Sequence, residues 1–313
     1  MKNNSDKKIF ITTGDFNGIG AEIVIKALNK LNLPSKNVVL ISNKKILDFY
    51  GGLNNDYDII EVPFEGGIEP KKLCDKSGEF SFKSLKIACE LVKKEQNCAI
   101  VTAPVAKNAL YLAGHKFNGQ TEVLESFLAH DLQHAEMLFV ADDFRVLLLT
   151  RHCAINQINL NEKIIIDKII NLDKFFKTQY CISSPRFALC GFNPHAGEDG
   201  ILGNEENDIL IPAVKKLNQL GINITMPKPA DALFMQAGKY YLNNDKMPYD
   251  CYISNYHDQG LVAIKSIAQD KCVNMTIGLD VIRTSPVHGT AFDIAGDDIA
   301  DETSMIEAIK AVL

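Results

Sequence analysis

The chain has 313 residues, of which 46% are hydrophobic and 23% charged, and its formal net charge is −6. This composition predicts a soluble globular protein with a large core, divided into two domains. The acidic balance argues against a nucleic-acid partner, because such proteins present a basic face. No run approaches the roughly 18 apolar residues that cross a bilayer, and residues 1–6 are polar, so no membrane partner and a cytoplasmic location are expected.

Apolar, β-rich runs alternate with helical patterns along the chain, which predicts an α/β architecture. The expected strands are 8–13, 38–42, 58–62, 99–102, 138–141, 146–150, 187–192, 251–255 and 273–277. The expected helices are 19–31, 80–95, 121–130, 162–176, 205–220, 230–242 and 302–312. Asn204 is the expected N-cap of the 205–220 helix. Because there is no long linker, a second domain requires the chain to cross between two lobes and return.

Glycines at the start of the chain follow the first expected strand and open a helix, as in a dinucleotide-binding loop. Gly18 and Gly20 fit the first two positions of G-x-G-x-x-G, but Ile23 occupies the third. No Walker A sequence occurs either. A classical Rossmann domain is therefore not expected.

Three histidines, His152, His195 and His257, each follow an apolar run that ends just before the imidazole. Loops after strands are where α/β proteins place chemistry. Three imidazoles around a divalent ion leave a position free for water or substrate, as in catalytic zinc sites. A single histidine is more often an ordinary structural residue, and the other four histidines are interpreted that way. Cys153, beside His152, is an alternative ligand or thiolate, although packing is the commoner role of a cysteine.

Cationic and amide side chains recur in the stretch that follows His257. Lys265, Asn274 and Arg283 each lie near the end of an expected element. Together they suit a phosphate or carboxylate, with forked hydrogen bonds from arginine and a point charge from lysine. A solvated surface cation is the simpler interpretation of Lys265, whereas Arg283 lies in an apolar setting that a solvated helix face does not provide.

Two segments resemble the β-decarboxylating dehydrogenases, the isocitrate and isopropylmalate enzymes. Residues 287–296 (V-H-G-T-A-F-D-I-A-G) resemble their H-G-[ST]-A-x-D-I-A-G signature, and residues 14–23 resemble their G-D-G-I-G-P-E-I segment. Those enzymes bind metal through aspartates, whereas this chain presents histidines. A fuller resemblance, from about residue 9 to the C-terminus, is to the 4-hydroxythreonine-4-phosphate dehydrogenase family. It rests on residues 119–122, 193–198 (N-P-H-A-G-E), 229–231, 256–260 (Y-H-D-Q-G), 273–274 and 282–285.

The resemblance implies a two-lobed α/β/α fold of the isocitrate dehydrogenase type. The first lobe would comprise 1–125 with 275–313 and the second 126–274, with the active site in the cleft between them. It also implies a homodimer in which one subunit supplies a metal ligand to the other, with NAD or NADP as cofactor. The implied metal is zinc, with cobalt or magnesium as alternatives.

The resemblance also assigns roles to individual residues. The metal ligands would be His152, His195 and His257; the phosphorylated substrate would contact Gln120, Thr121, Lys265, Asn274 and Arg283. NAD would lie near His288, Gly289 and Asp293, while Asp231 and Asp258 would transfer protons or orient a ligand imidazole. The chain departs from the family at Gln120, where a histidine is usual, because glutamine can hydrogen-bond but does not gain a charge near neutral pH.

The implied reaction is the oxidation of 4-phosphohydroxy-L-threonine to a β-keto acid, which decarboxylates to 3-amino-2-oxopropyl phosphate in vitamin B6 biosynthesis. A related dehydrogenase acting on threonate or erythronate 4-phosphate is the nearest alternative. A phosphate acyltransferase of related fold would need coenzyme A and has no use for three metal-binding histidines. A sensor that has lost turnover would not need to retain these histidines and cations.

Overall fold

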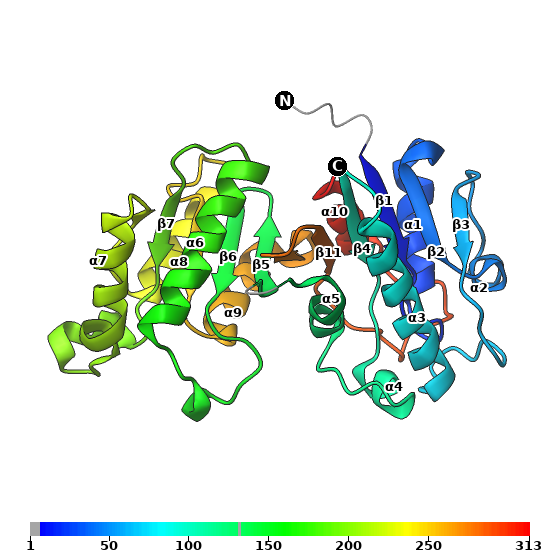
Figure 1. The fold of residues 1–313 in the computed structure, drawn as a ribbon, viewed down its shortest axis with the longest axis horizontal. Coiled ribbons are helices and arrows are strands. Elements are labelled where there is room, and N and C mark those ends of the chain that lie inside the picture. The colour runs from blue at the N-terminus through cyan, green and yellow to red at the C-terminus, as the bar shows by residue number, and fades with distance from the viewer. Residues whose placement is uncertain (1–6, 131–132) are drawn as a thin grey trace. The chain divides into compact units, whose positions relative to one another are not determined.

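The computed structural model describes residues 7–130 and 133–313, and the chain divides into two units. Unit 1 is Met1–Ala135 with Val273–Leu313, and unit 2 is Glu136–Cys272. Figure 1 shows that each unit contains its own strands with helices packed on them. Among the described residues, no helix combines the length and apolar composition that crossing a bilayer requires.

The described part of unit 1 contains six strands, and its central strands are buried along almost their whole length. Their order across the sheet is β3 (Asp58–Glu61), β2 (Val38–Ser42), β1 (Lys8–Thr12), β4 (Cys98–Thr102), β11 (Ile282–Pro286) and β10 (Val273–Ile277). All neighbours are parallel except β10, which is antiparallel to β11. Strands covered on both faces consist of continuous apolar runs, which explains why β1 and β2 were predictable.

Helices cover both faces of the unit 1 sheet. Helix α1 (Gly20–Leu31) connects β1 to β2, whereas α3 (Asp75–Val92) connects β3 back to β4 on the other side of β1. Because crossovers between parallel strands are right-handed, opposite directions of travel place these helices on opposite faces. Helix α10 (Thr303–Lys310) packs on α1, while α4 (Lys107–Leu112) and α5 (Gln120–Leu128) pack on α3 (Figure 1). The short α2 (Lys44–Phe49) follows β2.

Unit 2 contains five strands in the order β5 (Glu136–Ala141), β6 (Phe144–Leu148), β9 (Cys251–Ser254), β7 (Arg186–Leu189) and β8 (Asn223–Ile224). Strands β5 and β6 form an antiparallel hairpin, and the remaining neighbours are parallel. Helix α6 (Glu162–Gln179) packs on α7 (Ile211–Gln219), and α8 (Ala230–Leu242) packs on α9 (His257–Ala268). The carboxyl ends of β6, β9 and β7 therefore lie side by side at one edge.

The predicted α/β architecture and all nine predicted strands are present. Strands β8 and β11 and helices α2, α4 and α9 were not predicted, and α3 begins at Asp75 rather than at residue 80. The predicted capping of the 205–220 helix by Asn204 is wrong. The segment begins with a π-helical turn, Glu206–Leu210, in which no side chain caps the N-terminus, and α-helix follows only from Ile211.

Candidate functional site

The three candidate metal-binding histidines follow three adjacent parallel strands of unit 2. His152 follows β6, His257 follows β9 and His195 follows β7, so all three segments start from the same edge of the sheet. The prediction that each imidazole follows a strand is therefore confirmed. The interpretation of the His257 segment as a loop is wrong, because His257 is the first residue of helix α9.

Two amide side chains join the ends of these strands. The buried Asn255 donates from Nδ2 to the Cys190 backbone carbonyl at 2.9 Å. The backbone carbonyl of Asn255 accepts a hydrogen bond from Thr150 Oγ1 at 2.7 Å. Gln259 donates from Nε2 to the Gly191 carbonyl at 2.8 Å and accepts from the Asn255 backbone N–H at 2.8 Å. These bonds fix the starts of the loops that carry the histidines. Sequence analysis missed this role, although an amide directly after a buried strand was a usable signal.

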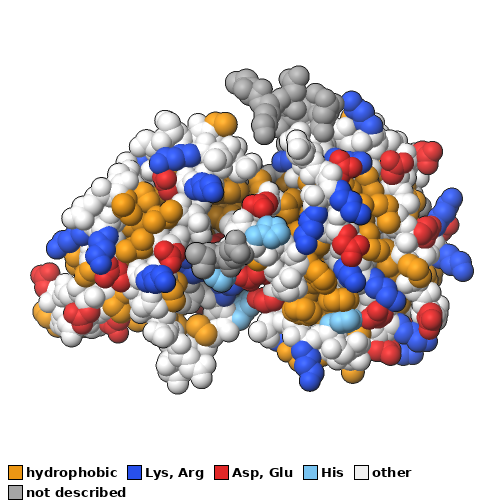
Figure 2. Space-filling view, viewed as in Figure 1, with side chains coloured by type: hydrophobic (Ala, Val, Ile, Leu, Met, Phe, Trp, Pro, Cys, Tyr) orange, Lys and Arg blue, Asp and Glu red, His pale blue; other side chains and the backbone are white. Residues whose placement is uncertain are grey.

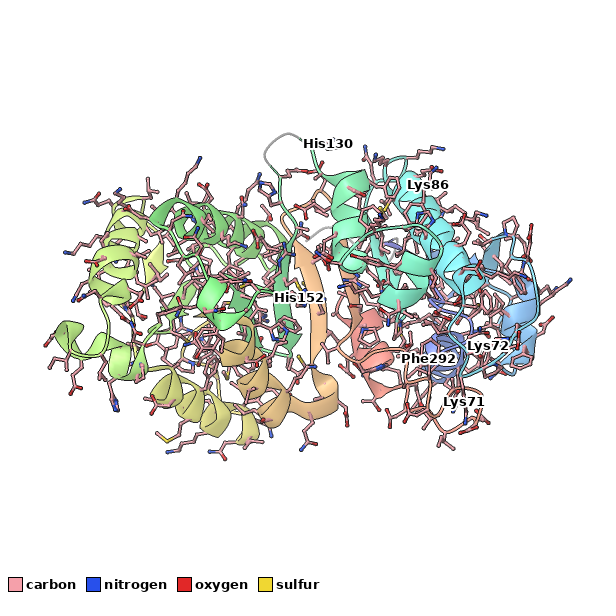
Figure 3. The ribbon with its side chains drawn as sticks, turned by 90° about the horizontal axis from the view of Figure 1, so that it is seen from below. Lys71, Lys72, Lys86, His130, His152 and Phe292 are labelled. Atoms are coloured by element: carbon pink, nitrogen blue, oxygen red, sulfur yellow. The ribbon has the colours of Figure 1, made fainter. Side chains whose placement is uncertain are left out.

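His152 and His257 lie close together, with ring centroids 5.5 Å apart. With Arg151, Cys153 and Asp258 they line a cavity of about 320 Å³ in unit 2; His152 is labelled in Figure 3. Asp258 Oδ1 lies 2.6 Å from His257 Nδ1. When Nδ1 carries the proton and donates to this carboxylate, Nε2 keeps its lone pair, which is the usual arrangement of a metal-binding histidine.

His195 lies in an exposed loop with unusual backbone geometry. All five residues from His195 to Asp199 have positive φ, between 45° and 81°. Within 7–130 and 133–313, no group of three histidine, cysteine or acidic side chains is close enough to hold one ion. The chain by itself therefore brings His152 and His257 together, but not His195 with them. Imidazole nitrogens are donors of the type that a zinc-like ion prefers, but this pair is fewer than the three or four protein ligands that such sites usually provide.

Arg283, on β11 of unit 1, is buried with 3% of its surface exposed. Its Nη2 and Nε donate to Thr102 Oγ1 at 2.7 and 2.9 Å, and Nη1 donates to Thr276 Oγ1 at 3.4 Å. Burial lowers the pKa of this guanidinium to about 10. In the described part of the chain, no carboxylate forms an ion pair with it. Glu122 favours the charged form only from beyond ion-pair distance, and a buried charge without a direct ion pair is costly, so this position suits an anionic ligand.

Other predicted substrate-binding residues surround Arg283. Asn274 lies on the same face of the β10–β11 pair, because the antiparallel register separates the two positions by an even number of residues. Thr121 Oγ1 accepts from Arg283 Nη1 at 3.5 Å, and Gln120 and Thr121 are the first two residues of α5. The N-terminus of a helix favours anions. Gln120 Nε2 donates to the Ala103 carbonyl at 3.0 Å.

The remaining polar candidates belong to unit 2 and are exposed. Lys265 lies on α9, two turns beyond His257, whereas Asn274 and Arg283 belong to unit 1. Asp231 lies in the first turn of α8, after β8, at the same edge of the sheet as the histidine segments. Both side chains are therefore accessible to a small molecule.

The predicted cofactor residues His288, Gly289 and Asp293 are exposed in the segment after β11. This segment contacts the start of α1, because Ile19 N–H donates to the Thr290 carbonyl at 3.0 Å. A Cβ atom on Gly18 would lie 2.9 Å from that carbonyl, so glycine permits the close approach. The two stretches that resemble dehydrogenase signatures therefore touch. Phe292 of this segment is labelled in Figure 3.

Asp15 is a buried acid in the glycine-containing loop that follows β1. Its carboxylate accepts from the Asn17 backbone N–H at 3.0 Å and from Ser77 Oγ at 2.9 Å. Burial outweighs these two hydrogen bonds and raises the pKa of Asp15 to about 6. An acid within a glycine-containing loop after a buried strand was a signal that could have identified it.

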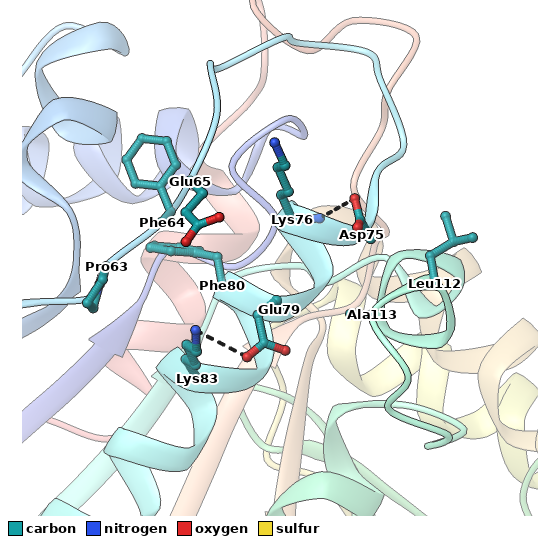
Figure 4. A pocket seen from close by; sticks show the side chains of 10 residues that line it. All are labelled: Pro63, Phe64, Glu65, Asp75, Lys76, Glu79, Phe80, Lys83, Leu112 and Ala113. Atoms are coloured by element: carbon teal, nitrogen blue, oxygen red, sulfur yellow. Dashed lines mark hydrogen bonds and ion pairs between the residues drawn. The ribbon is translucent and has the colours of Figure 1, made fainter.

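A cavity of about 430 Å³ in unit 1 lies away from all the predicted residues. Figure 4 shows that its lining includes Phe64, Phe80 and the Lys83–Glu79 ion pair, whose atoms are 3.2 Å apart. Glu79 also lies 2.6 Å from His115 Nε2, and this hydrogen bond lowers the pKa of Glu79. Because these charges are paired with one another, we assign no ligand to this cavity.

The fold is of the same type as that of the β-decarboxylating dehydrogenases. A β-decarboxylating dehydrogenase from Thermococcus kodakarensis superposes with a TM-score of 0.51 at 13% identity, covering 97% of this chain and 82% of that chain, which shows a shared fold. The family model described as "Pyridoxal phosphate biosynthetic protein PdxA" matches residues 12–312. The chain belongs to this family.

Relatives with sequence identity above 30% cover nearly the whole chain. A 4-hydroxythreonine-4-phosphate dehydrogenase from Sulfurihydrogenibium is 35% identical over 98% of this chain and 97% of its own length. A D-threonate 4-phosphate dehydrogenase from Cupriavidus necator is also 35% identical, over 96% of this chain and 95% of its own length. The crystal structure of a 4-hydroxythreonine-4-phosphate dehydrogenase from Klebsiella pneumoniae superposes with a TM-score of 0.84 at 32% identity, covering 98% of each chain.

Proposed function

We propose that this protein is an NAD-dependent, metal-assisted oxidoreductase that converts 4-phosphohydroxy-L-threonine to a β-keto acid in pyridoxine biosynthesis. Loss of carbon dioxide from that acid gives 3-amino-2-oxopropyl phosphate. The observation that carries the proposal is the buried Arg283, whose hydrogen bonds go to threonine hydroxyls in a site that suits a phosphate group. Membership of the family and the names of the relatives support the same reaction.

The substrate phosphate would be held chiefly by residues of unit 1. Arg283 supplies charge-assisted donors, Thr121 and Gln120 supply the N-terminus of α5, and Asn274 supplies an amide on the same sheet face. Lys265 would also contact the substrate, as the family resemblance implies. Binding energy gained at the phosphate end keeps the reacting carbinol aligned, which lowers the entropic barrier to oxidation.

Histidines 152, 195 and 257 would hold one divalent ion, with zinc as the preferred metal and cobalt or magnesium as alternatives. When bound, the metal lowers the pKa of the substrate hydroxyl, and NAD or NADP accepts the hydride. Asp258 would orient His257 through the 2.6 Å contact or transfer a proton, and Asp231 would transfer a proton or orient a ligand imidazole. We further propose a cytoplasmic homodimer in which one subunit supplies a metal ligand to the other, as the family resemblance implies.

The nicotinamide cofactor would contact the exposed residues His288, Gly289 and Asp293 of unit 1. Their segment rests against the start of α1 through the Ile19–Thr290 hydrogen bond, which gives the cofactor a fixed support. On the face of unit 1 shown in Figure 2, basic side chains alternate with acidic ones. Such a mixed surface suits a small-molecule substrate rather than nucleic acid.

The proposal is tested by measuring NADH formation by the purified protein with three substrates. We expect turnover with 4-phosphohydroxy-L-threonine. Turnover only with D-threonate 4-phosphate would favour the second candidate, which the Cupriavidus relative supports equally by identity. Erythronate 4-phosphate is the third substrate. Absence of NADH or NADPH formation with all three, with divalent metal present, would show that the proposed activity is wrong.

A further inference from the structure

A buried carboxylate anchors the loop that carries His195. Glu206 is 3% exposed, and its two oxygens accept from the backbone N–H and the Nδ2 of Asn193, both at 2.8 Å. The neighbouring Glu205 accepts from the same Nδ2 at 2.6 Å. Asn193 lies two residues before His195, so these bonds fix the entry to the histidine loop. The proposed reaction assigns no role to either glutamate.

The anchored loop has a backbone that needs support. His195, Ala196, Glu198 and Asp199 all have positive φ, a conformation that is unfavourable for residues with a side chain. Backbone hydrogen bonds hold the turn, including Leu202 N–H to the Gly197 carbonyl at 3.1 Å. Strain of this kind persists only where the surroundings impose it, and it concentrates at functional sites.

Two glycines allow the His195 loop to pack closely against the Glu206 carboxylate and the Asn193 amide. A Cβ atom on Gly197 would lie 2.7 Å from Glu206 Oε2, and one on Gly203 would lie 2.4 Å from Asn193 Nδ2. The loop therefore encloses the carboxylate and the amide with no room for larger residues. Glu206 also opens the π-helical turn before α7, which is an irregularity frequently found at functional sites.

The same loop is linked to the second histidine segment. Phe192 packs edge-on against Tyr256, with ring centroids 6.1 Å apart, and Tyr256 directly precedes His257. The placement of the His195 backbone is thus tied to the part of unit 2 that presents His257. An anchor on Asn193 therefore acts on the geometry of the candidate metal ligands.

We propose that Glu206 is a positioning residue, which acts through Asn193 to hold the left-handed backbone at His195 and thereby places this imidazole for metal binding. The inference rests on the proposed function, since it needs His195 to bind metal. Partners that orient metal ligands typically change metal affinity by 10- to 100-fold when they are removed.

The test is a titration of the full-length protein with Co²⁺, which reports both affinity and, through its visible absorption spectrum, ligand geometry. In Glu206→Gln, one of the two donors from Asn193 meets an NH₂ group instead of an oxygen. We expect the dissociation constant for Co²⁺ to be 10- to 100-fold larger and the visible absorption spectrum of bound Co²⁺ to change. Asp208→Asn, an equal charge change at an exposed position in the same π turn, should leave both unchanged. Thermal unfolding is followed in parallel.

A second variant keeps the inference open to refutation if Glu206→Gln does not fold. Asn193→Ala retains the backbone hydrogen bond to Glu206 but removes the side-chain link, and it should also weaken Co²⁺ binding at least tenfold. If Glu206 has a purely structural role, both variants should be less stable to heat but keep the Co²⁺ affinity and the spectrum of the wild type. That result would overturn the inference about Glu206 and leave the proposed metal site standing. If the wild-type protein binds no Co²⁺, or if His195→Ala binds it as tightly as the wild type, the proposed metal site and this inference both fail.

Discussion

Replacing Arg283 by methionine tests whether this buried cation serves a ligand or the fold. Methionine has a similar length and no charge, so it removes the guanidinium without leaving a large cavity. Burial lowers the pKa of Arg283 to about 10, a change from the ordinary arginine value that corresponds to about 3 kcal/mol. Arg283 holds its proton more tightly in the unfolded chain than in the folded protein, so its charge destabilises the folded state. This cost is fully present at neutral pH and disappears only as the pH rises through 10 and above.

The substitution removes this cost together with the hydrogen bonds to Thr102 at 2.7 and 2.9 Å. Hydrogen bonds to charged groups contribute about 1.5 to 3 kcal/mol each, so two bonds at the lower end of this range offset the burial cost. We expect the free energy of unfolding of the unliganded protein to stay within about 1 kcal/mol of the wild type. Phosphate should bind at least about 30-fold more weakly, because losing one partner of a buried charge pair costs about 2 kcal/mol or more.

Arg145→Met in unit 2 is the matched control. Arg145 is also buried, but its Nη2 donates to Asp143 Oδ1 at 2.7 Å and its guanidinium lies 4.5 Å from the centre of the Tyr180 ring. Its loss should lower the free energy of unfolding by about 1 to 3 kcal/mol and leave phosphate binding unchanged. Urea denaturation and calorimetric titration with inorganic phosphate measure both quantities. A loss above about 3 kcal/mol for Arg283→Met, or unaltered phosphate affinity, would refute the reasoning.

Three further variants, one of them with a matched control variant, test other parts of the molecule. His257→Ala should abolish stoichiometric binding of a divalent ion, measured by metal analysis after dialysis; retention of the ion would exclude His257 as a ligand. Burial raises the pKa of Asp15 to about 6, so its ionisation opposes folding above that pH and not below the ordinary aspartate range. Asp15→Asn should therefore stabilise the protein by about 2 to 3 kcal/mol at pH 8 and much less at pH 4, whereas a pH-independent effect would contradict this cause. Gly260→Ala should destabilise by about 1 to 3 kcal/mol, because its Cβ would lie 2.5 Å from Ser254 Oγ, while Gly67→Ala, with open space around it, should have little effect in the same thermal unfolding assay.

The sequence predicted the regular elements because the central strands are covered on both faces. Strands such as β2 and β9 are then uninterrupted apolar runs that no other structure explains as well. Strand β11 was missed because it carries Arg283 and neighbouring hydroxyl residues into a polar site, which hides the apolar pattern. Helix α9 was missed for a similar reason, since it begins with His257, Asp258 and Gln259, whose side chains serve the edge of the sheet.

Candidate residues of the site could be identified by residue type, whereas the residues that support them could not. Strand ends, a histidine and a shielded arginine can be recognised locally. Three supports depend on contacts between distant segments, which local sequence patterns do not reveal. They are the hydrogen bonds of the Asn255 side chain, the carboxylate of Glu206 beneath the His195 loop and the buried carboxylate of Asp15. The positive φ angles of His195 and Ala196 could not be predicted from the local sequence, because residues with a side chain seldom adopt this conformation.

Strand order explains why His152 meets His257 rather than His195, its nearer neighbour in sequence. The chain forms β6, then β7, then β9, but the sheet places β9 between the other two. Adjacent parallel strands are about 4.8 Å apart, so loops leaving β6 and β9 bring their rings close, as the observed 5.5 Å separation shows. His195 leaves β7, which is separated from β6 by a whole strand. The central position of β9 makes His257 the one of these three histidines whose strand adjoins the strands that precede the other two.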